Sequence, residues 1–246
     1  MKIALLGYGK MGQMIEKFAT QRGHSIVLKI GAGEVFELDE TMLKDADMAI
    51  DFSAPDAVLK HIDVCLNANV PVVVGTTGWY SQLQEVKDKV MASNNSLLYG
   101  SNFSVGVNLF FAANKYLAKL MNNYPVYDVQ IEEIHHTQKL DSPSGTAITI
   151  AEGIIEEIER KNEWVNHLED EIPQNVVKPN ELLIQSLRID EVPGTHTVIY
   201  SSEVDEITFQ HTAHNRAGFA LGAVVAAEWL ENKQGFYSVE DVFNFK

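Results

Sequence analysis

A glycine-rich turn near the start of the chain constrains the fold more than any other feature. Gly7, Gly9 and Gly12 have the spacing G-x-G-x-x-G, directly after the aliphatic run Lys2–Leu6 and before a segment of helical periodicity. Such glycines permit a tight strand-to-helix turn, close approach of a pyrophosphate and close helix packing. The free amides at the helix start then bind phosphate. We therefore expect a dinucleotide site here, including Lys10-Met11 within the turn.

Short apolar runs alternate with helical patterns from residue 1 to about residue 103. Strands that alternate with helices form a parallel sheet covered on both faces, so a Rossmann-type α/β domain is predicted. The segment between Gly31 and Asp47 is short for a full strand and helix. The predicted strands are Lys2–Leu6, Ser25–Ile30, Asp47–Phe52, Val70–Val74 and Ser96–Leu98.

The pattern changes after residue 104. Ser104–Met121 predicts a long amphipathic helix, and Val126–Ile134 alternates with the period of two that indicates a half-buried strand. Because several such strands follow, we expect an α+β domain with an open, mixed or antiparallel sheet. The polar residues 161–180 are predicted to form a long surface loop. Further strands are expected at Leu182–Ile189, Thr197–Ser201 and Glu206–Thr212.

The last predicted helix, Gly218–Leu230, is rich in small residues that permit close packing. We expect it to return to the first domain. The predicted domains are therefore a dinucleotide-binding domain of residues 1–104 and 217–246, and a substrate-binding and oligomerisation domain of residues 105–216.

Charge and cysteine content narrow the partners. The 246 residues carry a formal net charge of −15. Nucleic acids and anionic membranes are polyanions, so we expect neither as a partner. The apolar N-terminal run stops at Gly7, which is too short for a signal peptide or a membrane span. The single cysteine, Cys65, allows no intrachain disulfide. These features predict a cytoplasmic protein in which Cys65 is buried.

Residues 132–146 carry the densest chemistry and lie between a predicted strand and a predicted helix. His135 is suited to donate a proton near neutral pH, and Lys139 supplies a compact positive charge. Ser144-Gly145-Thr146 starts a helix whose amides and hydroxyls can hold a carboxylate. His136 points away from His135 in extended backbone, so at most one of them faces a given substrate atom. The grouping predicts a site for a small anionic substrate beside a proton donor.

The segment Glu133-Ile134-His135-His136-Thr137-Gln138-Lys139-Leu140-Asp141-Ser142-Pro143-Ser144-Gly145-Thr146-Ala147 closely resembles the signature of the dihydrodipicolinate reductase family. The resemblance implies reduction of 4-hydroxy-tetrahydrodipicolinate, a cyclic dicarboxylate, to tetrahydrodipicolinate with loss of water. The implied cofactor is NADPH or NADH, the implied pathway is the diaminopimelate route to lysine, and the implied assembly is a homotetramer formed through the second sheet. Other matching segments are Gly7–Gly12, Asp51-Phe52-Ser53, Gly75–Gly78, Asn102–Asn108, Val192–His196 and Arg216.

The resemblance also implies roles for single residues. His135 is the acid, and Lys139 binds and polarises the substrate. His136 joins Ser144, Gly145 and Thr146 at the substrate carboxylates. Thr195 departs from the family, which often has an acidic residue at this position, directly before His196. The residues expected at the cofactor, besides the glycine turn, are Lys29, Phe52, Gly75, Thr76, Thr77, Asn102, Phe103 and Arg216.

The preference between NADH and NADPH stays open. The acidic residue that binds the ribose 2′-hydroxyl in many such domains is not evident at the end of the second strand. That strand ends in Lys29-Ile30-Gly31, and the first acid after it is Glu34. Lys29 would favour a 2′-phosphate, whereas Glu34 would reach a ribose.

Three other functions fit part of the pattern. One is an NAD(P)-dependent reductase of a different imine or of a keto acid, and another is a non-catalytic NAD(P)H-sensing protein. The third is a metal-dependent hydrolase, since the chain has many histidines. We expect no metal, because neither an H-E-x-x-H motif nor a cysteine cluster is present. The histidines in question are His135, His136, His196, His211 and His214.

Overall fold

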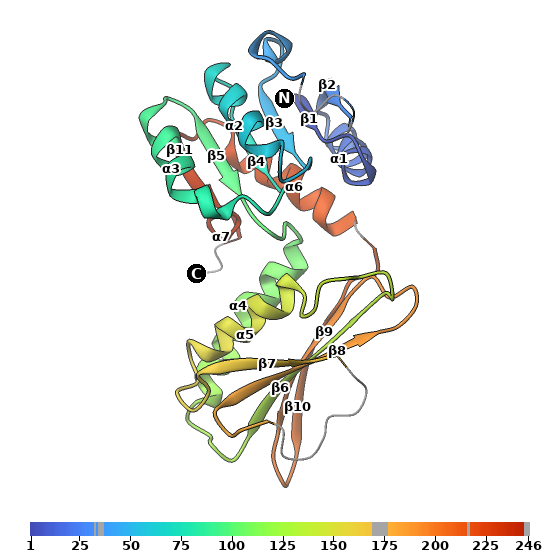
Figure 1. The fold of residues 1–246 in the computed structure, drawn as a ribbon, viewed down its shortest axis with the longest axis vertical. Coiled ribbons are helices and arrows are strands. Elements are labelled where there is room, and N and C mark those ends of the chain that lie inside the picture. Colours follow the sequence, from blue (N-terminus) through green and yellow to red (C-terminus); the bar gives the residue numbers. More distant parts are fainter. Residues whose placement is uncertain (32, 34–36, 169–176, 216, 244–246) are drawn as a thin grey trace. The chain divides into compact units, whose positions relative to one another are not determined.

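The computed structural model describes residues 1–31, 33, 37–168, 177–215 and 217–243 (Figure 1). The described chain divides into two compact units, one of residues 1–105 and 217–243 and the other of residues 106–215. The first unit is thus built from two separate stretches of sequence, and the second is inserted between them. None of the described helices is long and apolar enough to cross a membrane.

A parallel sheet forms the centre of the first unit. Its spatial order is β11-β5-β4-β3-β1-β2, and every pairing is parallel. The strand order reverses at β1, which lies between β2 and β3, and ligands of such sheets bind beyond the carboxyl ends of the strands at this point. The strands are β1 (Lys2–Leu6), β2 (Ser25–Ile30), β3 (Met48–Asp51), β4 (Val72–Val74), β5 (Ser96–Tyr99) and β11 (Gly235–Ser238).

Helices cover both faces of this sheet, as the alternating pattern predicts. Ile3 and Leu5 of β1 belong to the core under α1 (Lys10–Gln21) and α6 (Ala217–Leu230). Ala4 and Leu6 face the core under α2 (Val58–Asn67) and α3 (Leu83–Ala92). The remaining helix of the unit is α7 (Val239–Val242).

The small residues of α6 let the backbone of that helix approach the backbone at Phe103. A Cβ added at Gly222 would lie 1.6 Å from the carbonyl oxygen of Phe103, so only glycine fits there. The expected return of this helix to the first unit therefore depends on side chains that are absent or small.

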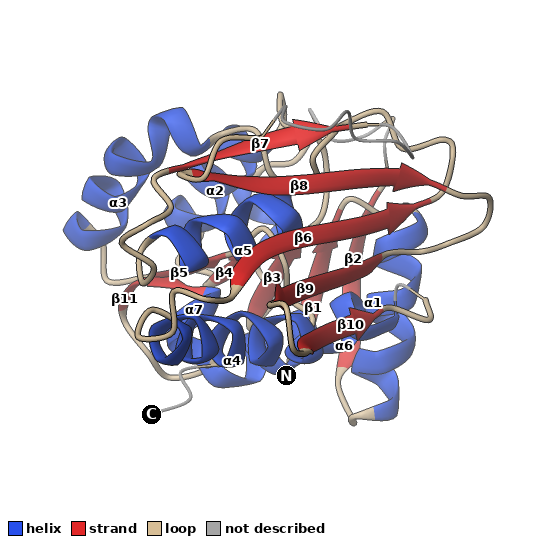
Figure 2. Cartoon of the chain, turned by 90° about the horizontal axis from the view of Figure 1, so that it is seen from below, coloured by secondary structure: helices blue, strands red, loops and turns tan. Residues whose placement is uncertain are grey.

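A mixed five-stranded sheet forms the second unit, in the order β10-β9-β6-β8-β7 (Figure 2). β9 pairs antiparallel with β6 and β10, whereas β8 pairs parallel with β6 and β7. Helices α4 (Val105–Met121) and α5 (Gly145–Ile155) share one apolar core with one face of the sheet. The strands are β6 (Asp128–His135), β7 (Glu163–His167), β8 (Glu181–Arg188), β9 (Thr195–Ser201) and β10 (Glu206–Thr212).

The predicted fold class, a parallel α/β domain with an α+β domain that carries a mixed sheet, is confirmed. Two elements differ from the prediction. The segment predicted as a loop at residues 161–180 contains β7, which pairs with β8, while residues 169–176 lie outside the described part. The C-terminal β11 was not predicted and pairs with β5. The short segment before β3 contains only a 3-10 helix, Glu40–Leu43, and no strand among its described residues.

Candidate active site

Strand register brings together polar residues that are far apart in the sequence. Glu133 and His135 are two residues apart on β6, so their side chains lie on the same face, beneath α5. The antiparallel pairing of β6 with β9 places Glu133 opposite His196, and the parallel pairing with β8 places His135 opposite Arg188. All four side chains are mostly or fully buried. The sheet therefore collects a carboxylate, two imidazoles and a guanidinium at one end of β6.

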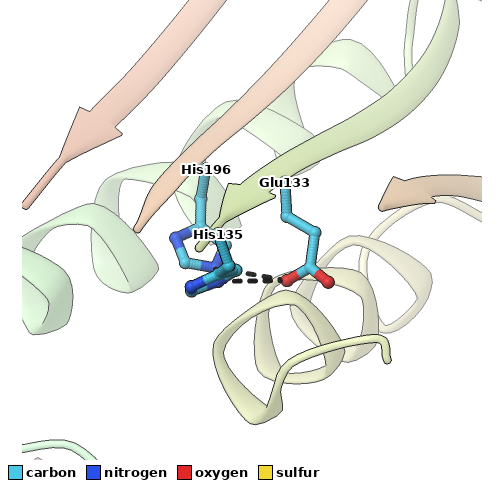
Figure 3. Close-up of side chains that lie close together, drawn as sticks. All are labelled: Glu133, His135 and His196. Carbon is cyan, nitrogen blue, oxygen red and sulfur yellow. Dashed lines mark hydrogen bonds and ion pairs between the residues drawn. The ribbon is translucent and has the colours of Figure 1, made fainter. Parts of the chain in front are cut away.

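The two imidazoles and the carboxylate contact one another through three atoms (Figure 3). Nε2 of His135 lies 3.4 Å from Nε2 of His196 and 3.4 Å from Oε2 of Glu133. Nε2 of His196 lies 3.6 Å from the same Oε2. His135 is not exposed to bulk solvent, since its side chain is only 10% exposed, and the Glu133 side chain is fully buried. Among the described residues, Glu133, His135 and His196 form a group whose ligand atoms lie close enough together to hold one metal ion.

Glu133 is held as a carboxylate by several donors. Burial alone would raise its pKa, but donors from His135, His196, Ser144 and Ser186 outweigh burial and hold the pKa of Glu133 well below its usual value. Ser186 Oγ donates to Oε1 over 2.7 Å, and the amide of Ser144 donates at 3.1 Å. Arg188 Nη2 lies 3.6 Å from Oε1. The negative charge therefore persists at neutral pH and can stabilise a proton on an adjacent imidazole.

His196 is held in a neutral state, in which one ring nitrogen can still donate to Glu133. Burial, the largest cause, lowers the pKa of His196, although Glu133 opposes the shift. Ser144 Oγ lies 3.0 Å from Nε2 of His196 and accepts from the amide of Ala147.

Gly194 leaves room for the ring of His135, because a Cβ at Gly194 would lie 2.9 Å from Cε1 of that ring. The His135 ring is thus fixed by contacts on several sides.

The start of α5 divides the predicted carboxylate-binding residues into two kinds. Ser144 is the N-cap of α5, and its amide and hydroxyl are already used by Glu133, Ala147 and His196. Gly145 is exposed, with open space where a Cβ would be. Gly145 and Thr146 occupy the first turn of the helix, where amides point outward from the N-terminus. Ser144 therefore positions Glu133 and His196, and open space lies beside Gly145 at the start of the helix.

Lys139 is outside the hydrogen-bonded cluster of Glu133, His135 and His196 among the described residues. Its Nζ lies 2.7 Å from Oδ2 of Asp141, and its side chain is 20% exposed. Hydrogen bonding to Lys139, against the opposing effect of burial, lowers the pKa of Asp141. The predicted cation is therefore present near the same segment but already carries a counter-ion.

Two buried polar atoms beside this segment have no hydrogen-bond partner within the described residues. They are Nδ1 of His136 and Nε of Arg188. Buried polar atoms in native proteins are nearly always satisfied, by the protein itself, by water or by a ligand. His136 was predicted from the sequence, whereas Arg188 was not. The local sequence offers one signal for Arg188. Along β8, Ser186 and Arg188 continue the alternate positions at which Leu182 and Ile184 face inward.

The glycine turn of the first unit has the geometry that its spacing predicts. Gly7 has φ +96°, and a Cβ there would lie 2.1 Å from the carbonyl oxygen of Phe52. A Cβ at Gly12 would lie 2.5 Å from the carbonyl of Gly7, whereas Gly9 has open space around it. α1 begins at Lys10, and no side chain caps its N-terminus. Its first amides are therefore left for another acceptor such as a phosphate.

A pocket of about 280 Å³ lies next to this turn. It is formed by Met11 with the loops that follow β3 and β4. A Cβ at Gly75 would lie 2.2 Å from the ring of Phe52, so this glycine is needed for the two loops to approach each other. The other lining residues are Ser53, Pro55, Thr76 and Thr77.

One buried carboxylate ties these two loops together. Asp51, the last residue of β3, is fully buried and accepts from Ser53 Oγ at 2.8 Å and from Thr76 Oγ1 at 2.5 Å. Its other oxygen lies 2.6 Å from Nδ1 of the fully buried His61. Ser53 Oγ approaches the same Nδ1 at 3.3 Å, unlike the hydroxyl of a catalytic triad, which contacts the imidazole nitrogen opposite the carboxylate. The cluster is therefore structural and holds the loops after β3 and β4 in place.

The other predicted cofactor residues occupy varied positions. Phe103 is almost fully buried, with its ring 5.8 Å from that of Phe52, and Asn102 accepts from the amide of Ser104 through Oδ1. Lys29 pairs with Glu16 at 2.7 Å and lies 4.7 Å from the centre of the Tyr8 ring. Arg216, like Glu34, lies outside the described residues.

Comparison with known proteins assigns the family. The model of "Dihydrodipicolinate reductase, N-terminus" matches residues 1–103, and that of "Dihydrodipicolinate reductase, C-terminus" matches residues 106–243. The chain belongs to the dihydrodipicolinate reductase family. The resemblance inferred from the signature at residues 133–147 is thereby confirmed. Membership makes the chain an oxidoreductase with a nicotinamide cofactor, as the glycine turn predicts.

Named relatives cover nearly the whole chain. The 4-hydroxy-tetrahydrodipicolinate reductase of Christiangramia forsetii is 46% identical over 246 residues, which cover 99% of this chain and 98% of that protein. The reductase of the same name from Methanosarcina acetivorans is 36% identical over 244 residues, which cover 98% and 88%. A dipicolinate-bound dihydrodipicolinate reductase from Paenisporosarcina sp. TG-14 superposes with a TM-score of 0.76 at 25% identity and covers 98% of each chain.

Proposed function

We propose that the chain reduces 4-hydroxy-tetrahydrodipicolinate to tetrahydrodipicolinate with NADPH or NADH, in the diaminopimelate route of lysine biosynthesis. The observation that carries this proposal is the buried contact of His135, at the start of the family signature, with Glu133 and His196. The reaction consumes the hydroxylated ring, one hydride and one proton, and it releases water. It therefore requires a bound dicarboxylate, a cofactor and an acid.

His135 supplies the proton in this proposal. Bound NADPH or NADH supplies the hydride. Electron density that arrives on the conjugated imine needs a proton donor or a cation nearby. The contact of Nε2 with the buried Glu133 supports this role, because the carboxylate fixes the orientation of the ring that would deliver the proton. Glu133 and His196 are positioning residues that fix the ring and its proton.

Lys139, His136, Ser144, Gly145 and Thr146 are proposed to bind the substrate carboxylates. The amides of the first turn of α5 and the ammonium of Lys139 attract anions. Nδ1 of His136, which has no hydrogen-bond partner in the described part of the chain, is a further donor or acceptor for such a ligand. Ser144 also supports the site through its contacts with Glu133 and His196. On binding, a substrate carboxylate competes with Asp141 for Lys139.

The cofactor is proposed to bind at the glycine turn, with the nicotinamide end at the loops of Phe52 and Gly75-Thr76-Thr77. The open amides at the start of α1 and the pocket beside them support this placement. Lys10 and Met11 belong to this first turn. Phe103 contributes by supporting Phe52 from the core, and Asn102 by shaping the loop after β5. Arg216 is retained as a cofactor contact on the family resemblance alone.

The proposed assembly is a homotetramer in the cytoplasm. Helices cover one face of the second sheet, while the opposite face presents mixed polar and apolar side chains such as Gln130, Glu132 and Ile199. A sheet face of this composition suits burial against a copy of itself. Light scattering coupled to size-exclusion chromatography gives the mass that tests this assembly.

A coupled assay tests the reaction. Freshly prepared 4-hydroxy-tetrahydrodipicolinate should oxidise NADPH or NADH in the presence of the chain, followed by nicotinamide absorbance. Running both cofactors in parallel fixes the preference, and Lys29→Ala shows whether the Lys29–Glu16 pair contributes to it. A panel of other cyclic imines and keto acids serves as the comparison. Turnover of any of these, with none of the dipicolinate precursor, would contradict the proposed substrate.

A further inference from the structure

The atoms that meet at the end of β6 form a nearly equilateral triangle (Figure 3). Its corners are Nε2 of His135, Nε2 of His196 and Oε2 of Glu133, and its edges are 3.4, 3.4 and 3.6 Å. A tetrahedral Zn²⁺ with bonds of about 2.0–2.2 Å holds its ligand atoms about 3.3–3.6 Å apart, because a tetrahedron's edge is about 1.6 times its radius. The triangle therefore has the size of one face of a zinc coordination sphere.

The chemistry of the three ligand atoms selects a class of ion. Two imidazoles and one carboxylate are a recurrent three-ligand set for Zn²⁺, with a fourth position left for water. Hard cations such as Mg²⁺ and Ca²⁺ prefer oxygen ligands and larger coordination numbers. The triangle thus favours Zn²⁺ or Co²⁺ over the abundant hard cations.

The surroundings hold Glu133 in the orientation that a metal would need. Oε1 accepts from Ser186 Oγ at 2.7 Å and faces Arg188, whose Nη2 is 3.6 Å away. Oε2 is the oxygen turned toward both imidazoles. The positive charge of Arg188 therefore lies on the Oε1 side of the carboxylate. Hydrogen bonds of this kind to a ligating carboxylate raise metal affinity by fixing its geometry.

We propose that Glu133, His135 and His196 bind one Zn²⁺-class ion, and that this ion inhibits the enzyme. The ion acts as an inhibitor rather than as a catalytic cofactor, because the proposed reaction needs no metal. An ion on Nε2 of His135 occupies the position of the proton that the reduction consumes. Metal binding and turnover are then mutually exclusive. The inhibitory half of this proposal rests on the proposed function, whereas the binding half does not.

Calorimetry with zinc chloride tests the binding half. The whole chain, treated with chelator and then freed of it, should take up one Zn²⁺ per chain. Cobalt(II) chloride should give the strong visible absorption of a four- or five-coordinate Co²⁺ ion. Glu133→Gln and His196→Asn should each weaken zinc binding about 100-fold or more, since even supporting residues of metal sites contribute 10–100-fold.

His211→Asn is the matched control. His211 lies opposite His196 in the β9–β10 pairing, but its ring is not part of the triangle. This variant should bind zinc as the parent chain does. Equal weakening by His211→Asn and His196→Asn, or no binding of zinc by the parent chain, overturns the site. Circular dichroism checks that each variant is folded, and His196→Asn carries the test if Glu133→Gln does not fold.

The reduction assay tests the inhibitory half. Zinc should abolish turnover of the parent chain, and EDTA should restore it. Variants that retain turnover should become resistant to zinc by the factor that calorimetry gives. Zinc bound at the triangle without inhibition would contradict the proposed role of His135 as the acid. A chain that binds zinc but reduces no substrate under any condition would contradict the proposed function and leave the metal site standing.

Discussion

Asp51 in the first unit and Glu133 in the second are both fully buried carboxylates near the end of a strand, and both contact histidine and hydroxyl groups. They differ in the imidazole. His61 is fully buried and belongs to α2, whereas the side chain of His135 keeps an exposed fraction of 10%. The same chemical groups therefore hold two loops in one unit and, in the proposed mechanism, present the proton-donating ring in the other. The small exposed fraction of the His135 ring, rather than the composition of the cluster, is the difference that its proposed catalytic role requires.

The largest effect should come from Asp51→Asn. The change removes the carboxylate to which two hydroxyls and the imidazole of His61 are hydrogen-bonded, and each buried group left without its partner costs about 1–3 kcal/mol of unfolding free energy. Urea denaturation measures this loss. Thr76→Val removes the hydrogen bond from Thr76 Oγ1 to Asp51 and the one that Oγ1 accepts from the amide of Ser53, and it should raise the KM for the cofactor with little change in kcat. A Thr76→Val variant with unaltered cofactor KM would show that Asp51 does not position the cofactor loops.

His135→Gln tests the other side of the comparison. It should lower kcat about 10²-fold, the usual consequence of losing a general acid, at saturating substrate. His61→Gln is the contrasting variant, and it should lower stability while the surviving folded enzyme keeps most of its kcat. If His135→Gln left kcat unchanged, the ring would not be the proton donor.

Lys139→Ala should have a smaller effect. The ammonium is partly exposed and already paired with Asp141, so solvent and a competing carboxylate weaken its field. We expect kcat/KM to fall about 10-fold, with contributions from both kcat and KM. A 10-fold fall corresponds to the loss of a modest interaction of about 1.4 kcal/mol. Steady-state kinetics measures the split. A change confined to thermal stability would make Lys139 structural.

Cys65 provides the mildest test, because no change is expected in the native chain. Burial raises the pKa of the Cys65 thiol, and the charge of Asp51 adds to this effect. A thiol with a raised pKa carries little thiolate at neutral pH and resists modification. Cys65 should therefore stay unreactive toward a thiol reagent in the native chain and become reactive in Asp51→Asn as that variant opens. Rapid labelling of the native chain would argue against a closed core around Asp51.

Much of the fold is predictable from local patterns. The strand Lys2–Leu6 and the strand Ser25–Ile30 have the predicted bounds, since apolar runs flanked by glycine or polar residues leave little choice. β7 and β11 are different, because neither Glu163–His167 nor Gly235–Ser238 is strongly apolar or alternating. Both become strands through pairing at the edge of an existing sheet. Tertiary pairing of this kind has no local signature.

The candidate site is predictable only in part. His135 belongs to a dense local segment whose chemistry is visible in the sequence. The contacts of Glu133 with His196 and Ser186 depend on the registers of β6 with β9 and β8, which bridge more than fifty residues. Sequence spacing also suggests that Ser144 is free for a ligand, whereas its role as the cap of α5 uses its hydroxyl and amide. Register and capping decide which polar groups remain available.

The insertion of the second unit between two stretches of the first affects the order of folding during translation. β11 and α6 complete the six-stranded sheet and one of its two cores, and both come after residue 216. A ribosome therefore releases the whole middle unit before it has made the last parts of the first. Domains generally fold as units while the nascent chain emerges. The inserted unit can reach its native packing first. The six-stranded sheet of the first unit keeps an unpaired edge at β5 until β11 has been synthesised.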